Sequence, residues 1–113
     1  MNLTINGQEQ ELNFGVRFVR ELDKVAGINK DGVQLGFGLT RSLPGMQTYN
    51  PATLSDVIYA ATATNSPRPS RNDVDDYIDS IESIDELEKV FEEVNQGIDK
   101  ANALKAALKN MKA

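Results

Sequence analysis

Hydrophobic residues are spaced most regularly in the last part of the chain, from Ser83 to Ala113. They recur there at steps of three or four positions, which is the period of one face of an α-helix. Ser83 and Glu86 form a capping box, because the hydroxyl and the carboxylate can each bind a free backbone N–H of the first turn. Gly97 is the only weak helix former in the stretch. The pattern predicts one long helix with an apolar stripe of Ile84, Leu87, Phe91, Val94, Ile98, Ala101, Leu104, Leu108 and Met111.

Residues 1–14 alternate between apolar and polar positions, as expected of a strand pair. Asn6-Gly7 is the strongest signal for a two-residue type I′ turn, and this turn would pair Ile5 with Gln8. Paired residues share one face of a hairpin. The pattern therefore predicts a β-hairpin that needs a core beneath one side. The predicted apolar face is Leu3, Ile5, Leu12 and Phe14.

Residues 15–64 are predicted to form a helical core. A first helix over Val16–Ala26 ends at Gly27, a residue type that often follows a helix C-terminus. A later helix begins after Asn50, because Asn is a favourable N-cap and Pro51 fits the first helical position. The predicted buried faces are Val16, Phe18, Val19, Leu22, Val25 and Ala26 in the first helix, and Leu54, Val57, Ile58 and Ala61 in the later one.

The segment between these helices is less regular. Asp31-Gly32 marks a turn within Ile28–Gln34, which leaves a second small hairpin and a plain loop as alternatives. The apolar residues of Leu35–Leu43 predict a short helix up to Pro44, which cannot continue a helix easily. Two glycines weaken this helix, so we expect the segment to be either closely packed or mobile.

The main break in the chain is Asn65–Pro69, whose two prolines predict an exposed connector. Ser70 then caps a further helix. Together these elements predict an α+β fold, with an N-terminal β-hairpin packed on a small helical bundle that ends in a long C-terminal helix. The parts of the expected single domain, 1–113, are the hairpin (1–14), the helical core (15–64), the connector (65–69) and the acidic C-terminal helices (70–113).

The apolar stripe of the last helix is the candidate partner-binding surface. The helix could fold back and complete its own core, or it could bind a second copy or another protein. The three-residue step from Ala101 to Leu104 argues against a long regular coiled coil. The hairpin and the earlier helices can cover its first half, so we expect disorder or a partner beyond Gly97. The proposed binding residues are Leu87, Phe91, Val94, Ile98, Ala101, Leu104 and Leu108.

Composition excludes several kinds of chemistry. The 113 residues are 40% hydrophobic, which suits one domain with a modest core, and they include no Cys and no His. A disulfide, a thiolate or imidazole metal site and histidine-based nucleophilic catalysis are therefore excluded. The N-terminus has no basic and apolar leader, and no apolar run approaches membrane-spanning length. We expect a soluble cytoplasmic protein without a membrane partner.

Charge is distributed unevenly along the chain, whose formal net charge is -5. Acids and bases cancel over residues 1–70, whereas residues 71–99 contain eleven acids and two bases. An acidic segment of this size repels the nucleic acid backbone, so no nucleic acid partner is expected. Residues 100–113 carry four lysines, which suit a solvated face at the C-terminal end of a helix.

Two motifs could carry chemistry, and in both the structural interpretation is favoured. The aspartates of the first acidic helix are spaced loosely like a Ca²⁺ loop, but they lack its glycine and its terminal glutamate. Gly36-Phe37-Gly38 lacks the third glycine and the Lys-Ser/Thr of a phosphate loop. We therefore expect no enzyme activity, no cofactor and no metal site. The aspartates in question are Asp73, Asp75, Asp76 and Asp79.

The chain resembles the tail assembly chaperones of siphophages and prophages of Gram-positive bacteria. The resemblance covers roughly the first 95 residues and rests on fold motifs, so it identifies no active site. The matching segments are Leu3–Gly7, Leu12–Val16, Phe18–Asp23, Gly36–Leu39, Asn50-Pro51, Leu54–Thr62 and Val74–Ile78.

This resemblance implies a non-enzymatic protein that acts during virion assembly in the host cytoplasm and is absent from the finished particle. Proteins of this family coat the tape measure protein and help to recruit tail tube subunits. A longer product made by ribosomal frameshifting is thought to contact the tube protein. The resemblance also favours a homo-oligomer. The alternative function is a structural virion component, such as a tail-completion or head–tail connector protein, and a third is a small regulatory binding module.

Overall fold

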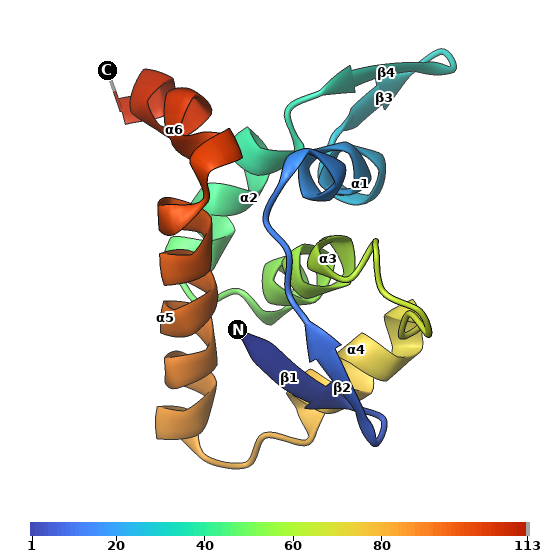
Figure 1. The fold of residues 1–113 in the computed structure, drawn as a ribbon. Coiled ribbons are helices and arrows are strands. Elements are labelled where there is room, and N and C mark those ends of the chain that lie inside the picture. The colour runs from blue at the N-terminus through green and yellow to red at the C-terminus, as the bar shows by residue number, and fades with distance from the viewer. Residues whose placement is uncertain (113) are drawn as a thin grey trace.

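The computed structural model describes residues 1–112, and it confirms the α+β fold with an N-terminal hairpin and a C-terminal helix (Figure 1). Two separate antiparallel hairpins, β1–β2 and β3–β4, accompany the helices. In chain order the elements are β1 (Asn2–Ile5), β2 (Gln8–Glu11), α1 (Val16–Ala26), β3 (Ile28–Lys30), β4 (Val33–Gly36), α2 (Gly38–Gln47), α3 (Pro51–Ala61), α4 (Arg71–Asp79), α5 (Ile84–Lys100), the 3-10 turn η1 (Asn102–Leu104) and α6 (Lys105–Lys112).

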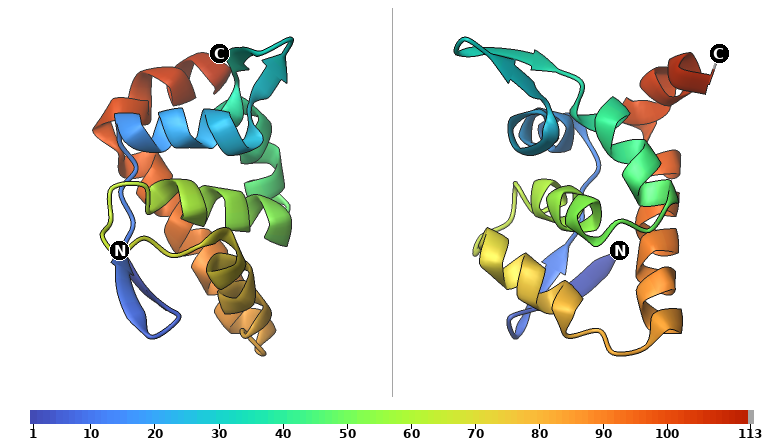
Figure 2. Two further views of the ribbon diagram at one scale, coloured as in Figure 1. Left: turned by 90° about the vertical axis from the view of Figure 1, so that its right-hand side faces the viewer. Right: turned by 180° about the vertical axis from the view of Figure 1, so that it is seen from behind.

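Helices α1 and α3 lie side by side in the middle of the molecule, and α5 runs along one flank (Figure 2). The β1–β2 hairpin and α4 lie at one end, while the β3–β4 hairpin and α6 lie at the opposite end (Figures 1 and 2). One cluster of buried side chains joins these parts, and it draws residues from Leu3 near the N-terminus to Leu108 in α6. Burial of this apolar surface is the main favourable contribution to folding.

The N-terminal hairpin has the predicted register. Ile5 pairs with Gln8 and Leu3 with Gln10. Asn6 and Gly7 both have positive φ, at 50° and 75°, as a type I′ turn requires. Gln10 shares the buried face with Leu3, and its amide donates a hydrogen bond of 3.1 Å to the carbonyl oxygen of Pro67. The predicted apolar face did not include Gln10, and this bond provides a partner for its buried amide.

Helix α1 has the predicted bounds, but Val16 was wrongly assigned to its buried face. Val16 is 59% exposed, whereas Phe18 and Leu22 are buried in the core. The reason is geometric, because Val16 lies across the helix from Phe18 and Leu22 when successive residues turn by about 100°. Val19, three positions after Val16, lies beside it on the helix and is only half-buried, so this side of α1 is at the border between core and solvent.

The sequence left a second small hairpin and a plain loop as alternatives for the segment after α1. The segment forms a hairpin. A helix forms after this hairpin as predicted, but its predicted bounds were wrong, because β4 extends to Gly36 and α2 runs from Gly38 through Pro44 to Gln47. The packing of two residues holds the last turn of α2 in spite of the proline. Met46 is fully buried, and Gly45 lies directly against the side chain of Thr53 in α3.

The caps of α3 and α4 form as the sequence indicates. The Asn50 side chain accepts the N–H of Ala52 at 2.9 Å. The Ser70 hydroxyl oxygen accepts a hydrogen bond from the N–H of Asp73, and the Asp73 carboxylate accepts one from the N–H of Ser70, both at 3.0 Å. The connector between these helices is less exposed than expected, since Pro69 is buried and Arg68 is half-buried.

The prediction of one unbroken helix after Ser83 was wrong. Helix α5 ends at Lys100, the backbone turns at Ala101, and α6 leaves in a new direction (Figure 1). The turn brings Leu104 and Leu108 into the core, which outweighs the intrinsic preference of this segment for a continuous helix. Disorder beyond Gly97 was therefore also a wrong expectation for the described residues, and Ala113 lies outside them.

Candidate partner-binding surfaces

The predicted partner-binding stripe follows α5, η1 and α6, and most of it faces the core of the same chain. A partner could contact these buried side chains only if α5 or α6 moved away from the core. Binding through this stripe therefore stays a prediction. Five of its residues are buried, namely Phe91, Val94, Ile98, Leu104 and Leu108, and two are half-buried, namely Leu87 and Ala101.

A group of exposed apolar side chains lies on the β3–β4 hairpin and the residue after it. Val33, Leu35 and Phe37 are 58%, 49% and 56% exposed. The hairpin extends from the body of the protein beside α1 (Figure 1). Sequence reasoning missed this surface because it assigned residues 35–43 to a helix. Apolar residues at every second position from Val33 were the signal for a strand.

The base of this hairpin is fastened to α1. The carboxylate of Asp23 accepts the backbone N–H of Gly38 at 2.9 Å. Gly38 lies against the backbone of Leu22, which leaves no room for a Cβ atom, and Gly36 has a φ of +82° that favours glycine. The two glycines of the Gly36-Phe37-Gly38 motif therefore have structural roles in a close-packed connection.

A recess of about 380 Å³ lies between α1 and β4. Leu35 supplies an apolar wall, while Arg20 and Lys24 add exposed positive charge from α1. Lys24 also pairs with Glu21 at 3.6 Å. We call β3, β4, Phe37 and the recess the hairpin end. The residues that line the recess are Arg20, Asp23, Lys24, Gln34, Leu35 and Gly36.

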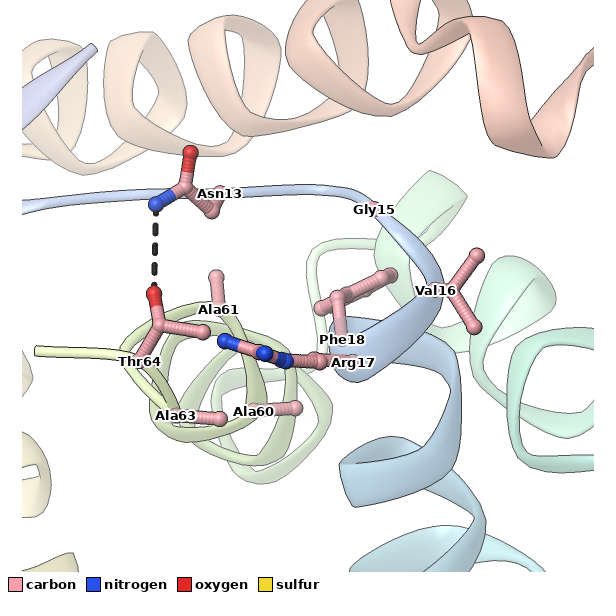
Figure 3. Close-up of a pocket in the computed structure, with 9 residues that line it drawn as sticks. All are labelled: Asn13, Gly15, Val16, Arg17, Phe18, Ala60, Ala61, Ala63 and Thr64. Atoms are coloured by element: carbon pink, nitrogen blue, oxygen red, sulfur yellow. Dashed lines mark hydrogen bonds between the residues drawn. The ribbon is translucent and has the colours of Figure 1, made fainter.

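A second recess, of about 260 Å³, lies where the chain enters α1 and passes the end of α3 (Figure 3). Its walls are mainly small and apolar, with Ala60, Ala61 and Ala63 on one side. At its edge the Asn13 side-chain amide donates a hydrogen bond of 3.3 Å to the Thr64 hydroxyl oxygen (Figure 3). Arg17 is the one ionisable residue among those that line it, so the recess provides no acid–base pair.

The opposite end of the molecule is acidic. Asp75, Asp76 and Asp79 of α4 are exposed there, as are most acids in the first half of α5. Ile84 lies among them and is 75% exposed, although the sequence placed it on the apolar stripe. We call α4 and residues 82–93 the acidic end. The aspartates belong to a helix that is capped and solvated, as favoured from the sequence, and Asp75 accepts a hydrogen bond from the Ser55 hydroxyl.

Two tyrosines border the acidic end. Desolvation raises the pKa of Tyr49 above 10.0, and the nearby carboxylates of Glu92 and Glu88 raise it further. Burial likewise raises the pKa of Tyr77, with a contribution from Glu93. Both hydroxyls are therefore protonated and neutral at physiological pH.

The described residues contain no group of three or more acidic side chains placed to hold a metal ion. Among the same residues, no helix combines the length and the apolar character needed to cross a membrane.

The fold and its surfaces define a small α+β protein with exposed apolar side chains at two opposite ends, one of which is acidic. The chain belongs to the phage tail assembly chaperones, because the family model described as "Phage tail assembly chaperone protein, TAC" matches residues 2–112. This match confirms the family inferred from the sequence motifs. No curated protein and no solved structure matches the chain.

Proposed function

We propose that this chain is a non-enzymatic chaperone that binds the tape measure protein during tail assembly, and that residues 1–113 act as one unit. Membership of the tail assembly chaperone family carries the proposal. A tape measure protein presents long apolar helical surface, which aggregates unless another protein covers it. The exposed apolar side chains at the hairpin end and the high surface charge suit a protein that covers such a surface and keeps the complex dissolved.

The proposal includes two further partners. A longer frameshifted product of the same gene would bring tail tube subunits to the tape measure protein, and copies of the chain would associate with one another. Both steps would take place in the host cytoplasm, and the protein would leave before the virion is complete. A siphophage or prophage of a Gram-positive host remains the predicted origin.

Co-expression with the tape measure protein encoded nearby in the same genome tests the central claim. We expect the tape measure protein to become soluble and to be captured with the tagged chain. A tagged acidic protein of similar size serves as the control. A tape measure protein that stays equally insoluble with both proteins would contradict the proposal.

Mass spectrometry of purified virions separates this function from that of a structural virion component. We expect the chain to be absent from virions and present in the lysate. Its recovery from virions in amounts comparable to a tail protein would favour the structural role.

The predicted stripe on α5 and α6 can be tested in the same complex. If the tape measure protein displaces these helices and binds the stripe, amide hydrogen exchange at Phe91, Val94 and Ile98 should change strongly on binding. Unchanged exchange there, with protection at the hairpin end, would assign binding to the exposed surface instead.

A further inference from the structure

Helix α6 is held in the fold almost entirely by apolar contacts. Leu104 in η1 and Leu108 in α6 are 1% and 7% exposed, and both belong to the core. The ion pairs of the described residues all lie before Lys100, and so do the hydrogen bonds that their side chains form. No other described element packs against α6 as extensively as its own chain neighbours η1 and α5. Burial of two leucines is therefore what keeps this helix in place.

The connection between α5 and α6 bends at one residue. Ala101 has extended backbone angles, with φ -71° and ψ 119°, whereas Lys105 at the start of α6 is helical, with φ -59° and ψ -42°. Alanine has the highest helix propensity, and residues 102–112 contain neither Gly nor Pro. A change of ψ at Ala101, with conversion of η1 to an α-helical turn, would join α5 and α6 into one straight helix. This change would lift Leu104 and Leu108 from the core.

The neighbouring helices are fastened by polar contacts as well as by burial. In α4, Asp75 accepts a hydrogen bond from the Ser55 hydroxyl, and in α5 the Asn95 amide donates one of 3.5 Å to the carbonyl oxygen of Met46. For α6, two contributions oppose each other. The straight form gains the backbone hydrogen bonds of a continuous helix across residues 101–104, and the bent form gains the burial of the two leucines. Helix α6 is thus the element that can open while the rest of the core stays assembled.

We propose that α6 is a releasable helix that swings out to continue α5, and that the apolar site it covers then binds an amphipathic helix of the tape measure protein. The resident helix shows the chemistry of this ligand. Leu104 and Leu108 are buried anchors four positions apart, while Lys105 and Lys109 remain exposed. Recognition of a helix in a groove uses anchors spaced in this way. The inference rests on the proposed function and assigns its binding site and its regulation.

Competition for one site makes α6 an intramolecular inhibitor. The apparent affinity for the partner falls in proportion to the fraction of chains whose site is open. The free chain therefore keeps this apolar surface covered and protected from aggregation. A partner helix displaces α6 when it offers more anchors than the two leucines.

The covered site favours this occupant over others. A small molecule would find no open recess there, because Leu104 and Leu108 fill the site in the free chain. A second copy offers only an α6 of the same sequence, and the tethered α6 has the higher effective concentration beside the site. A longer amphipathic helix is the ligand that gains by replacement, since it adds anchors that α6 lacks.

Amide hydrogen exchange of the full chain tests whether α6 opens by itself. We expect residues 101–112 to exchange roughly 10- to 100-fold faster than the middle of α5. Leu108→Ala should speed exchange in residues 101–112 by roughly another 10-fold and leave α5 unchanged, because it weakens only the cover. Leu54→Ala, in the core of α3, should instead speed exchange in α5 and leave α6 unchanged. Lys109→Ala, on the exposed side of α6, is the matched control and should change neither.

A pair of spin labels follows the release directly. The chain contains no cysteine, so Glu88→Cys and Lys109→Cys provide unique attachment sites at exposed positions of α5 and α6. A continuous helix would place these positions about 32 Å apart, whereas the bend at Ala101 shortens the distance (Figure 2). We expect the longer distance to appear when the co-expressed tape measure protein is bound. A label pair at Glu9 and Glu88 does not include α6 and serves as the control.

Several outcomes would overturn the proposal. One is an equal effect of Leu108→Ala on exchange in α5 and α6, which would show that α6 opens only with the whole protein. Another is a doubled mass in light scattering that Leu108→Ala abolishes, because it would mean that two chains exchange their α6 helices. Capture of the tape measure protein at an unchanged Glu88–Lys109 distance would overturn the releasable helix and leave the proposed function intact. A tape measure protein that is never captured would end the proposed function and the partner named here, while the exchange data would still decide whether α6 opens.

Discussion

The ring of Phe14 lies directly against Gly97 in α5, and a Cβ atom at position 97 would come within 2.6 Å of the ring carbon Cε2. The residue that the sequence marks as the weak point of the helix is thus the site where the segment after the N-terminal hairpin packs onto it. Phe14 also contacts Phe18 edge to face, with ring centroids 5.1 Å apart. The glycine lets α5 approach this aromatic pair closely.

The first prediction concerns this contact. At a solvent-exposed position inside a helix, a change such as Gly97→Ala would stabilise the folded protein by about 1 kcal/mol. Here the added methyl group meets the Phe14 ring, and overpacking costs about 1–3 kcal/mol. We expect a net loss of unfolding free energy in urea titrations. Gln96→Ala, on the exposed side of α5, should change stability little or raise it slightly. A Gly97→Ala variant that is more stable than the parent would contradict the packing argument.

The second prediction concerns the fastening of the β3–β4 hairpin. Asp23→Ala leaves the N–H of Gly38 without its acceptor, and an unsatisfied buried donor costs about 1–3 kcal/mol. We expect faster amide hydrogen exchange at Gly38 and through β4. Asp23→Asn keeps an acceptor oxygen and should lose less. Equal exchange in all three proteins would show that the contact does not hold the hairpin.

The third prediction compares two helix caps. Ser70 and Asp73 exchange reciprocal bonds of 3.0 Å, whereas Ser83 accepts one bond of 3.4 Å from Glu86. Ser70→Ala should therefore cost about 1 kcal/mol of unfolding free energy, and Ser83→Ala should cost less. Chemical denaturation of the two variants side by side measures the difference. The reverse order would be inconsistent with the bond geometry.

The fourth prediction is a pH dependence at Tyr77. Burial and Glu93 raise its folded-state pKa above 10.0, so the folded state holds the phenolic proton more tightly than the unfolded state does. The stability from this group is fully present below the ordinary tyrosine pKa and is lost as pH rises through the folded value. Tyr77→Phe should flatten the decline of the melting temperature at alkaline pH. Parallel profiles for parent and variant would exclude this linkage.

Local signals predicted the parts of this fold that depend on a few neighbouring residues. The Asn6-Gly7 turn, the Asn50-Pro51 start of α3 and the Ser70 cap each form as expected, because a turn or a cap is stabilised within one or two turns of chain. The family was also accessible from sequence motifs, since the family model matches residues 2–112.

Tertiary packing decided what these signals could not. The period of three and four correctly marked an apolar stripe, but only the fold shows that Phe91 is buried and that Ile84 is exposed. In the same way, Leu104 lies in the core because the chain bends at Ala101, in a segment whose residues all permit a helix. The free energy of burying a side chain depends on which distant residues surround it. The sequence by itself thus determined where turns, caps and amphipathic segments lie, while the choice of covered face and the exposure of the β3–β4 hairpin came from long-range contacts.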